Sequence, residues 1–198
     1  MRSFLIACIL VLAMLGLGGF LLLREGLSAR PEGSVVEAAL AGYARAWSLP
    51  ADYRNLRNPL DCSAAGVLAD ARMHWADHCA TCHANNGSGD AMVGRGMYPK
   101  PPDMRSPATQ TRSDGAVYFT INNGVRFTGM PAFGQPGARD TDTWKLVCFV
   151  RHLPQMTPEE EQLMKKLNPK TPDEIEEERE EEEFLNGKAD IKMNRTKR

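Results

Sequence analysis

Two cysteines and a histidine, Cys79, Cys82 and His83, lie within five positions of the chain in the sequence CATCH. Near the end of a helix, side chains at positions i, i+3 and i+4 lie on one face, so both thiols and the imidazole can point to the same side. Thiols with this spacing can bond the two vinyl groups of a haem while the adjacent imidazole reaches the iron. The pattern therefore predicts covalent attachment of one haem c.

Two other kinds of site use the same residue types. A structural zinc site needs four ligands, and the second pair would have to be Cys148 and His152. A thioredoxin-like redox pair belongs to a strand-to-helix unit, and no such pattern surrounds this motif. Neither alternative explains the long loops rich in Gly and Pro, so haem attachment is favoured over both.

A haem iron bound by His83 needs a second axial ligand, and Met130 is the best candidate. It lies in the sequence TGMPAFG, 47 residues after His83. Gly129 permits close approach of the backbone to the ring, and Pro131 stiffens the loop that presents the thioether. The predicted iron ligands are therefore His83 and Met130.

The remaining histidines fit this role less well. His74 and His78 precede the thiols on the same predicted helix, so they cannot reach the opposite face of the ring. His152 lies in the predicted C-terminal helix, where a partly exposed surface role is expected. Two axial protein ligands leave no position for a substrate, so we expect an electron-transfer protein rather than an enzyme.

The N-terminal segment predicts a membrane anchor. Residues 4–23 are 20 residues without a charge, flanked by Arg2 and Arg24. At ~1.5 Å per residue, a helix of this length spans the ~30 Å hydrocarbon core of a bilayer. A cleaved signal peptide is the alternative, but its apolar region is usually ~7–15 residues and ends in an A-x-A-like site. We favour an uncleaved anchor, and the positive-inside rule then places the rest of the chain outside the cytoplasm.

A short amphipathic helix is expected after the anchor. Ser34 and Glu37 occupy capping-box positions. Apolar residues follow at helical spacing, namely Val36, Leu40, Tyr43 and Trp47. This helix either lies near the membrane surface or packs on the domain that follows, and the sequence leaves both possibilities open.

Three helices are predicted in the domain that contains the motif. The first begins at Asp61 and leads into the cysteines, the second begins at Ser113 or Asp114, and the third begins at Thr141 or Asp142 and stops at Pro154. Residues 85–111 are expected to form a loop. Three helices with connections this long would form a weak core alone, so the domain is expected to fold around a bound group.

The chain resembles class I c-type cytochromes, in particular bacterial membrane-anchored monohaem ones. The resemblance covers about residues 58–154 and rests on four sequences in order: CATCHANNGSGD, YPKPPDM, INNGVRFTGMPAFG and DTWKLVCFVRHLP. It implies an all-α class I cytochrome c fold, with few helices and long loops wrapped around one covalent haem. It also implies that the first and last helices cross, here through Trp75.

The resemblance extends to the residues around the haem. It implies that the carbonyl of Pro102 holds the imidazole of His83, and that Met104, where the family prefers Leu, contacts the haem. Ala71 and Ala84 stand where the family usually has Gly. Both alanines are small, so we expect them to be tolerated.

These expectations divide the chain into four parts: a membrane anchor (1–24), a juxtamembrane spacer (25–57), a cytochrome c haem domain (58–156) and a charged C-terminal extension (157–198). Between residues 173 and 183 the extension has nine acidic residues and one Arg, so we expect an acidic helix or disorder. Cys62 and Cys148 are expected to be unpaired, because no spacing rule links them.

The function expected is that of a monohaem cytochrome carrying single electrons between membrane-associated or periplasmic redox partners of a respiratory chain. It would be a single-pass protein of the cytoplasmic membrane, with its haem domain on the periplasmic or extracytoplasmic side. Residues 24–156 have 14 basic and 12 acidic residues and no basic patch interleaved with aromatics, which argues against nucleic-acid binding. The alternatives are a haem-based gas or redox sensor, or a cytochrome subunit of a larger oxidoreductase complex.

Overall fold

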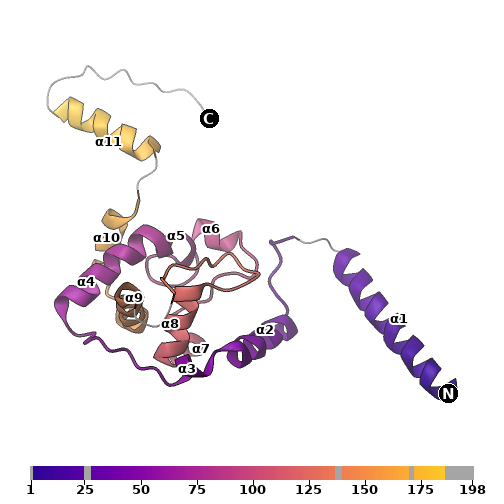
Figure 1. Cartoon of the computed structure of the whole chain (residues 1–198). Helices are drawn as coiled ribbons and strands as arrows, with labels where there is room; N and C mark the ends of the chain where they lie inside the picture. The colour runs from indigo at the N-terminus through magenta and orange to yellow at the C-terminus, as the bar shows by residue number, and fades with distance from the viewer. Residues whose placement is uncertain (1, 25–27, 137–139, 170–171, 186–198) are drawn as a thin grey trace.

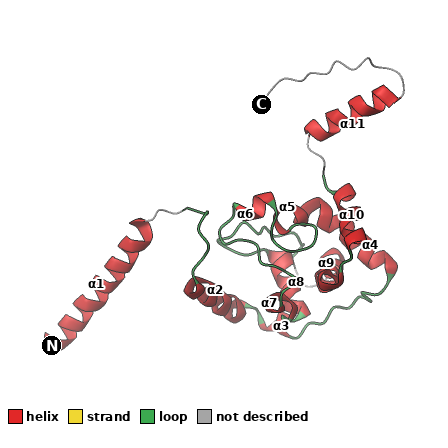
Figure 2. Cartoon of the chain, turned by 180° about the vertical axis from the view of Figure 1, so that it is seen from behind, coloured by secondary structure: helices red, strands yellow, loops and turns green. Residues whose placement is uncertain are grey.

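The structure, a computed structural model, describes residues 2–24, 28–136, 140–169 and 172–185, in which helices are joined by loops and turns (Figures 1 and 2). In chain order the elements are α1 (Arg2–Arg24), α2 (Val35–Ser48), α3 (Ala51–Arg54), α4 (Ala65–His74), η1 (Trp75–Cys79), α5 (Ala80–His83), α6 (Met92–Arg95), α7 (Pro107–Gln110), α8 (Asp114–Asn123), α9 (Thr141–His152), η2 (Leu153–Gln155), α10 (Pro158–Leu167) and α11 (Pro172–Leu185). These ranges contain no strand, which confirms the predicted all-α fold.

Helix α1 lies apart from the other helices in both views (Figures 1 and 2). Its residues Arg2–Leu21 are long and apolar enough to cross a membrane once, and none of that stretch is buried in the protein. Its length and composition are compatible with a membrane anchor, and a signal sequence near an N-terminus has the same properties.

The centre of the domain is the crossing of α4 with α9. Ala71 of α4 is 1% exposed, so this alanine fits the crossing where a glycine is usual. At the next turn, the rings of Trp75 and Phe149 pack with their centroids 5.3 Å apart. Leu146 and Val150 of α9 are also fully buried in this core. The predicted contact of the first and last helices through Trp75 is therefore present.

Helix α8 packs on the other side of α9. The rings of Tyr118 and Trp144 pack at a tilt of 33° with centroids 4.2 Å apart, and Tyr118 is completely buried. The Tyr118 hydroxyl accepts a hydrogen bond from the backbone N–H of Asp140 at 3.0 Å. Asp140 in turn caps α9 by accepting from the backbone N–H groups of Asp142 and Thr143. Helix α9 thus begins at Thr141, one of the two starts that the sequence predicted.

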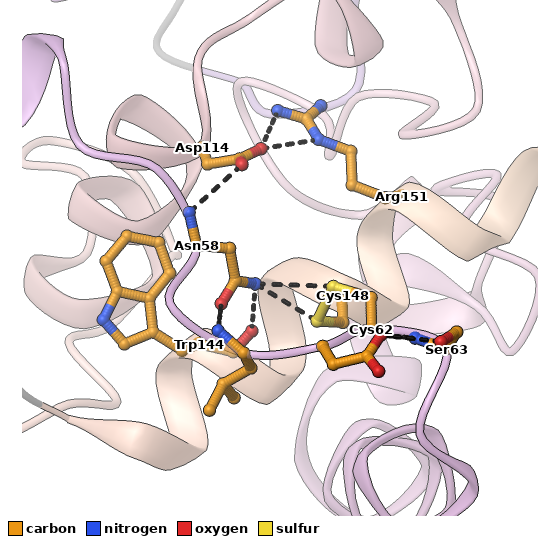
Figure 3. Close-up of a disulfide and its surroundings, with 9 residues drawn as sticks. Asn58, Cys62, Ser63, Asp114, Trp144, Cys148 and Arg151 are labelled. Atoms are coloured by element: carbon orange, nitrogen blue, oxygen red, sulfur yellow. Dashed lines mark hydrogen bonds and ion pairs between the residues drawn. A yellow bond between two sulfur atoms is a disulfide. The ribbon is translucent and has the colours of Figure 1, made fainter.

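A disulfide joins Cys62 to Cys148, so the expectation that both thiols are free was wrong (Figure 3). The bond ties the segment before α4 to the middle of α9, across a sequence separation of 86 residues. The side-chain amide of Asn58 donates to the Cys148 sulfur at 3.1 Å and to the Trp144 carbonyl at 2.9 Å. Spacing could not reveal this pair, because only the fold brings the two cysteines together.

The end of the predicted spacer also packs on the domain. Tyr53 of α3 lies against α8, with its ring 5.0 Å from that of Phe119. The backbone N–H of Gly115 donates to the Leu56 carbonyl at 3.2 Å, and a side chain at Gly115 would collide with the carbonyl of Tyr53. Only glycine therefore allows this close approach of the spacer to α8.

Asp114, the first residue of α8, joins three segments at the same end of the domain (Figure 3). Its carboxylate accepts from the backbone N–H of Asn58 at 3.3 Å and from Arg151 of α9 at 3.0 and 2.8 Å. A guanidinium that donates twice to one carboxylate is a directional, charge-assisted contact. Residues 53–62 are consequently held to α8 and α9 by covalent, polar and apolar contacts together.

Helix α10 belongs to the same packed unit, although the sequence assigned it to the C-terminal extension. Met164 of α10 is completely buried in the core. Glu160 binds Arg72 of α4 at 2.8 Å and His152 of α9 at 3.0 Å. We therefore propose that the domain ends near Leu167 rather than at residue 156.

Two further differences concern helix boundaries. Helix α4 begins at Ala65, not at Asp61, because Asp61 accepts from the backbone and hydroxyl of Ser63 in a turn next to the disulfide. The expected loop at 85–111 contains two single-turn helices, α6 and α7. The capping box at Ser34 is formed as predicted, a second one at Thr157 begins α10, and α11 is a helix from Pro172 to Leu185.

The disulfide predicts a large loss of stability in Cys62→Ser. Opening a loop of 86 residues should lower the free energy of unfolding by about 4–5 kcal/mol, because the unfolded chain regains that freedom. Guanidinium denaturation of the oxidised protein measures it. Cys8→Ser, which makes the same substitution at an exposed residue of α1, is the matched control. Equal midpoints for both variants would show that the bond contributes nothing.

Candidate functional site

The candidate site begins with a change of helix type. Trp75–Cys79 form a π-helical turn between α4 and α5, in which the backbone N–H of Ala80 donates to the carbonyl of Trp75. A π-turn inserts one extra residue into a helix and rotates everything after it. Trp75 can therefore face α9 while the cysteines that follow face a different direction. The sequence, which predicted one continuous helix, gave no sign of this turn.

The structure brings Cys79, Cys82 and His83 together at the end of this helix. Both thiols are free, Cys79 is buried, and Cys82 is half-buried. Burial raises the pKa of the Cys79 thiol to about 12, and the neighbouring Cys82 adds to the rise. In the protein without bound groups, Cys79 is therefore an uncharged thiol at neutral pH.

His83 is buried and polar, a combination that needs a partner. Burial lowers the pKa of its imidazole to about 4, so the ring is neutral at physiological pH and has a lone pair free for a metal. The Trp75 ring lies 5.9 Å from that of His83, and its indole N–H donates to the Ala84 carbonyl at 3.1 Å. Nδ1 of His83 is buried and has no hydrogen-bond partner among the described residues.

The segment expected to hold His83 passes close to it. The backbone N–H of Gly89 donates to the carbonyl of His83 at 2.9 Å, and a side chain at Gly89 would collide with the carbonyls of Pro101 and Pro102. The expected hydrogen bond from His83 to Pro102 is not among the contacts of the described residues, so the role of Pro102 stays a prediction. Met104 is partly buried against the core, with its backbone N–H bonded to the Gly87 carbonyl at 2.8 Å.

The loop that contains Met130 folds back on the end of α8. The Met130 carbonyl accepts from the backbone N–H of Val125 at 3.0 Å, and the backbone N–H of Phe133 donates to the Ile121 carbonyl at 3.2 Å. The Phe133 ring stacks on that of His78 in η1, with centroids 6.2 Å apart. The loop is therefore packed against the helix that carries the cysteines, and His78 is occupied in this contact.

A second methionine, Met97, lies against the loop that contains Met130. The Met97 methyl group lies against Gly129, where a side chain would collide with it. Both Met97 and Met130 are half-buried. The sequence singled out Met130 from its Gly and Pro neighbours, and nothing in the local sequence marked Met97 as its neighbour in space.

Ala84 has an unusual backbone conformation directly after His83. Its φ is 61° and its ψ is 161°, a region that residues with a side chain rarely adopt. This explains why the family usually has Gly at this position. The alanine is accommodated here at a cost to stability.

Residues 66–150 match the family model of Cytochrome C oxidase, cbb3-type, subunit III. The matched segment runs from α4 to α9 and includes the cysteines, His83 and the Met130 loop. This segment is a class I c-type cytochrome domain. No curated protein matches the chain.

A c-type cytochrome domain binds haem c covalently, and the residues present fit that group. Cys79 and Cys82 supply two free thiols at the required spacing. His83 supplies a neutral imidazole, and its unpartnered Nδ1 could carry the proton and donate the supporting hydrogen bond that a metal-bound histidine makes. The cytochrome sequence contains one such motif.

The ligand assignment predicts the spectrum of Met130→Ala. The ferric protein should lose the far-red charge-transfer band of methionine-ligated haem, because no thioether would remain on the iron, while the haem stays covalently attached. Absorption from 600 to 750 nm measures this. Met97→Ala is the matched control and should keep the band. If Met97→Ala loses the band and Met130→Ala keeps it, the iron ligand is Met97 and not Met130.

The backbone of Ala84 predicts that Ala84→Gly stabilises the cytochrome. Glycine adopts this conformation without strain, and relief should raise the free energy of unfolding by about 1 kcal/mol. Chemical denaturation followed by haem absorbance measures the change. Ala69→Gly, at an exposed position inside α4, should instead destabilise by about 1 kcal/mol. A lower free energy of unfolding in Ala84→Gly would show that the backbone of Ala84 is not strained.

Proposed function

We propose that the protein is a membrane-anchored monohaem c-type cytochrome that carries single electrons between membrane-associated or periplasmic redox partners. The observation that carries this proposal is the set of two free thiols and a buried, neutral, unpartnered imidazole in a class I c-type cytochrome domain. The single attachment motif supports one haem per chain.

The residues of the site suit electron transfer rather than bond chemistry. A haem c held there supplies one-electron exchange at its iron. Cys79 and Cys82 would hold the group covalently, and His83 and Met130 would both bind its iron, which would leave no position for a substrate. The thioether of Met130 is neutral and would favour the ferrous state, and so raise the reduction potential. Burial of His83 keeps the imidazole deprotonated and available to the iron.

An extracytoplasmic location is supported by two independent features. Helix α1 has the length and composition of a single membrane span. The Cys62–Cys148 disulfide fits an oxidising compartment, because disulfides rarely persist in the cytosol. The haem domain would then stand on the periplasmic or outer side of the cytoplasmic membrane.

A second candidate function is that of a cytochrome subunit in a larger oxidase complex. The matched family is described as a subunit of cbb3-type cytochrome c oxidase, which favours this candidate. Both candidates require the same one-electron chemistry and differ only in whether the partner is permanent. A sensor would instead need Met130 to leave the iron and open a position for a gas.

We expect that the reduced full-length protein does not bind carbon monoxide at neutral pH within minutes, because Met130 would hold the second ligand position of the iron. Soret difference spectra measure this. Met130→Ala should bind the gas and serves as the positive control. The alkaline pyridine spectrum should give one haem c per chain. Rapid binding by the unaltered protein would favour a sensor, and copurification with a catalytic subunit would mark the oxidase alternative.

A further inference from the structure

Helix α2 has an apolar side that is exposed along its whole length. We call this side the apolar stripe and define it by Val36, Leu40, Tyr43 and Trp47, which are 67, 64, 77 and 87% exposed. Their spacing of four, three and four residues places them on one face of the helix. No residue of α2 is buried. The structure therefore does not pack this stripe on the haem domain, which was one of the two possibilities that the sequence left open.

One flank of α2, next to the stripe, contacts the domain at its N-terminal end, where a side chain built on Gly33 would lie 3.3 Å from the Tyr98 hydroxyl and 3.9 Å from the Glu37 carboxylate. The Glu37 carboxylate accepts a hydrogen bond from the Tyr98 hydroxyl, which raises the pKa of Tyr98. Burial lowers the pKa of Arg112, and the nearby guanidinium of Arg45 lowers it further. Arg45 lies nine positions after Val36, on the opposite face of the helix. Because all four residues of the apolar stripe are at least 64% exposed, the stripe does not lie against the domain.

Both ends of α2 are fixed to the domain. At the N-terminal end, Lys100 donates to Glu32 at 3.0 Å, next to the Glu37–Tyr98 contact. At the C-terminal end, α3 follows within three residues and packs on α8 through Tyr53. Figures 1 and 2 show α2 along one edge of the domain, beside α3 and α7. The direction of the stripe relative to the haem domain is therefore set by contacts at both ends.

The chain itself brings α2 close to the apolar helix α1. Ten residues separate Arg24 from Val35, which can span at most about 35 Å. Such a tether raises the effective concentration of α2 at a membrane crossed by α1 to the millimolar range, so a stripe with weak affinity of its own can stay bound. Tyr43 and Trp47 are residue types that favour the boundary between lipid and water.

We propose that α2 lies in the surface of the bilayer that α1 crosses, with the apolar stripe in the lipid and the haem domain on its polar side. This inference rests on the proposed membrane anchor and adds to it an orientation. The domain is held by α2 with one fixed face toward the membrane plane. A partner in the same membrane would then always meet the same face of the haem domain. A domain joined to α1 by a flexible linker alone would present every face.

Trp47 provides a direct test, because Trp75 and Trp144 are only 2 and 4% exposed. The full-length haem protein is reconstituted into phosphatidylcholine vesicles with and without bromine on the acyl chains. Bromine quenches a tryptophan that reaches the acyl region, so emission should fall about twofold or more in brominated lipid. Trp47→Phe should abolish the difference. Equal emission in the two lipids would overturn the proposal.

Two variants test whether a charge weakens lipid contact only when it lies within the apolar stripe. Leu40→Glu places a carboxylate in the stripe and should lower the quenching of Trp47 at least about twofold, because the charge resists burial in lipid. Ala41→Glu adds the same charge on the same helix, at an exposed position outside the stripe, and should leave quenching unchanged. Equal quenching in both variants would contradict the orientation.

Two further measurements distinguish other environments of the stripe and test the membrane anchor separately. Quenching of Trp47 by acrylamide without quenching by bromine would place the stripe in water. Protection from both, together with cross-linked dimers, would assign it to a second copy, and either result refutes the proposal. Retention in vesicles after an alkaline carbonate wash tests α1 alone. If the protein stays in the vesicles but bromine does not quench Trp47, only the inference about α2 is refuted. If the wash removes the protein from the vesicles, the anchor itself is refuted.

Discussion

The contact of Trp75 with α9 is the interaction on which the rest of the cytochrome domain depends. The indole packs on Phe149 at the crossing of α4 and α9, and its other neighbours are the ring of His83 and the carbonyl of Ala84. One side chain thus links the apolar core to the residues that would hold the haem. The π-turn that starts at Trp75 makes this double role possible, because it changes the direction in which the following residues face.

A second set of contacts extends the domain beyond its family core in both directions. The disulfide and Asp114 hold residues 53–62 against α8 and α9. On the other side, Met164 and Glu160 hold α10 against α4. These contacts offset part of the conformational entropy that residues 53–62 and α10 lose on folding.

These extensions also connect the chemistry of the site to the membrane. A cytochrome on an unstructured tether would meet its partners in any orientation, and only a fraction of encounters would bring the haem close enough for electron transfer. Here α2 and α3 are both attached to the domain, through Tyr98 and Tyr53 respectively. The proposed placement of α2 in the bilayer surface would convert this attachment into a fixed orientation for electron transfer.

The sequence by itself determined the local features. The CATCH spacing, the apolar stretch of α1, the capping boxes and the amphipathic pattern of α2 each depend on residues within one or a few turns, so helix geometry alone makes them readable. The choice of Met130 among ten methionines likewise came from its immediate Gly and Pro neighbours, and it remains a prediction.

Only the tertiary structure decided which distant residues meet. The Cys62–Cys148 bond, the approach of Met97 to Gly129 and the burial of Met164 all join residues far apart in the chain, and no periodicity encodes such pairs. The direction of the α2 stripe was undecided for the same reason. An amphipathic pattern shows that a helix has an apolar side, but the contacts at both of its ends determine where that side points.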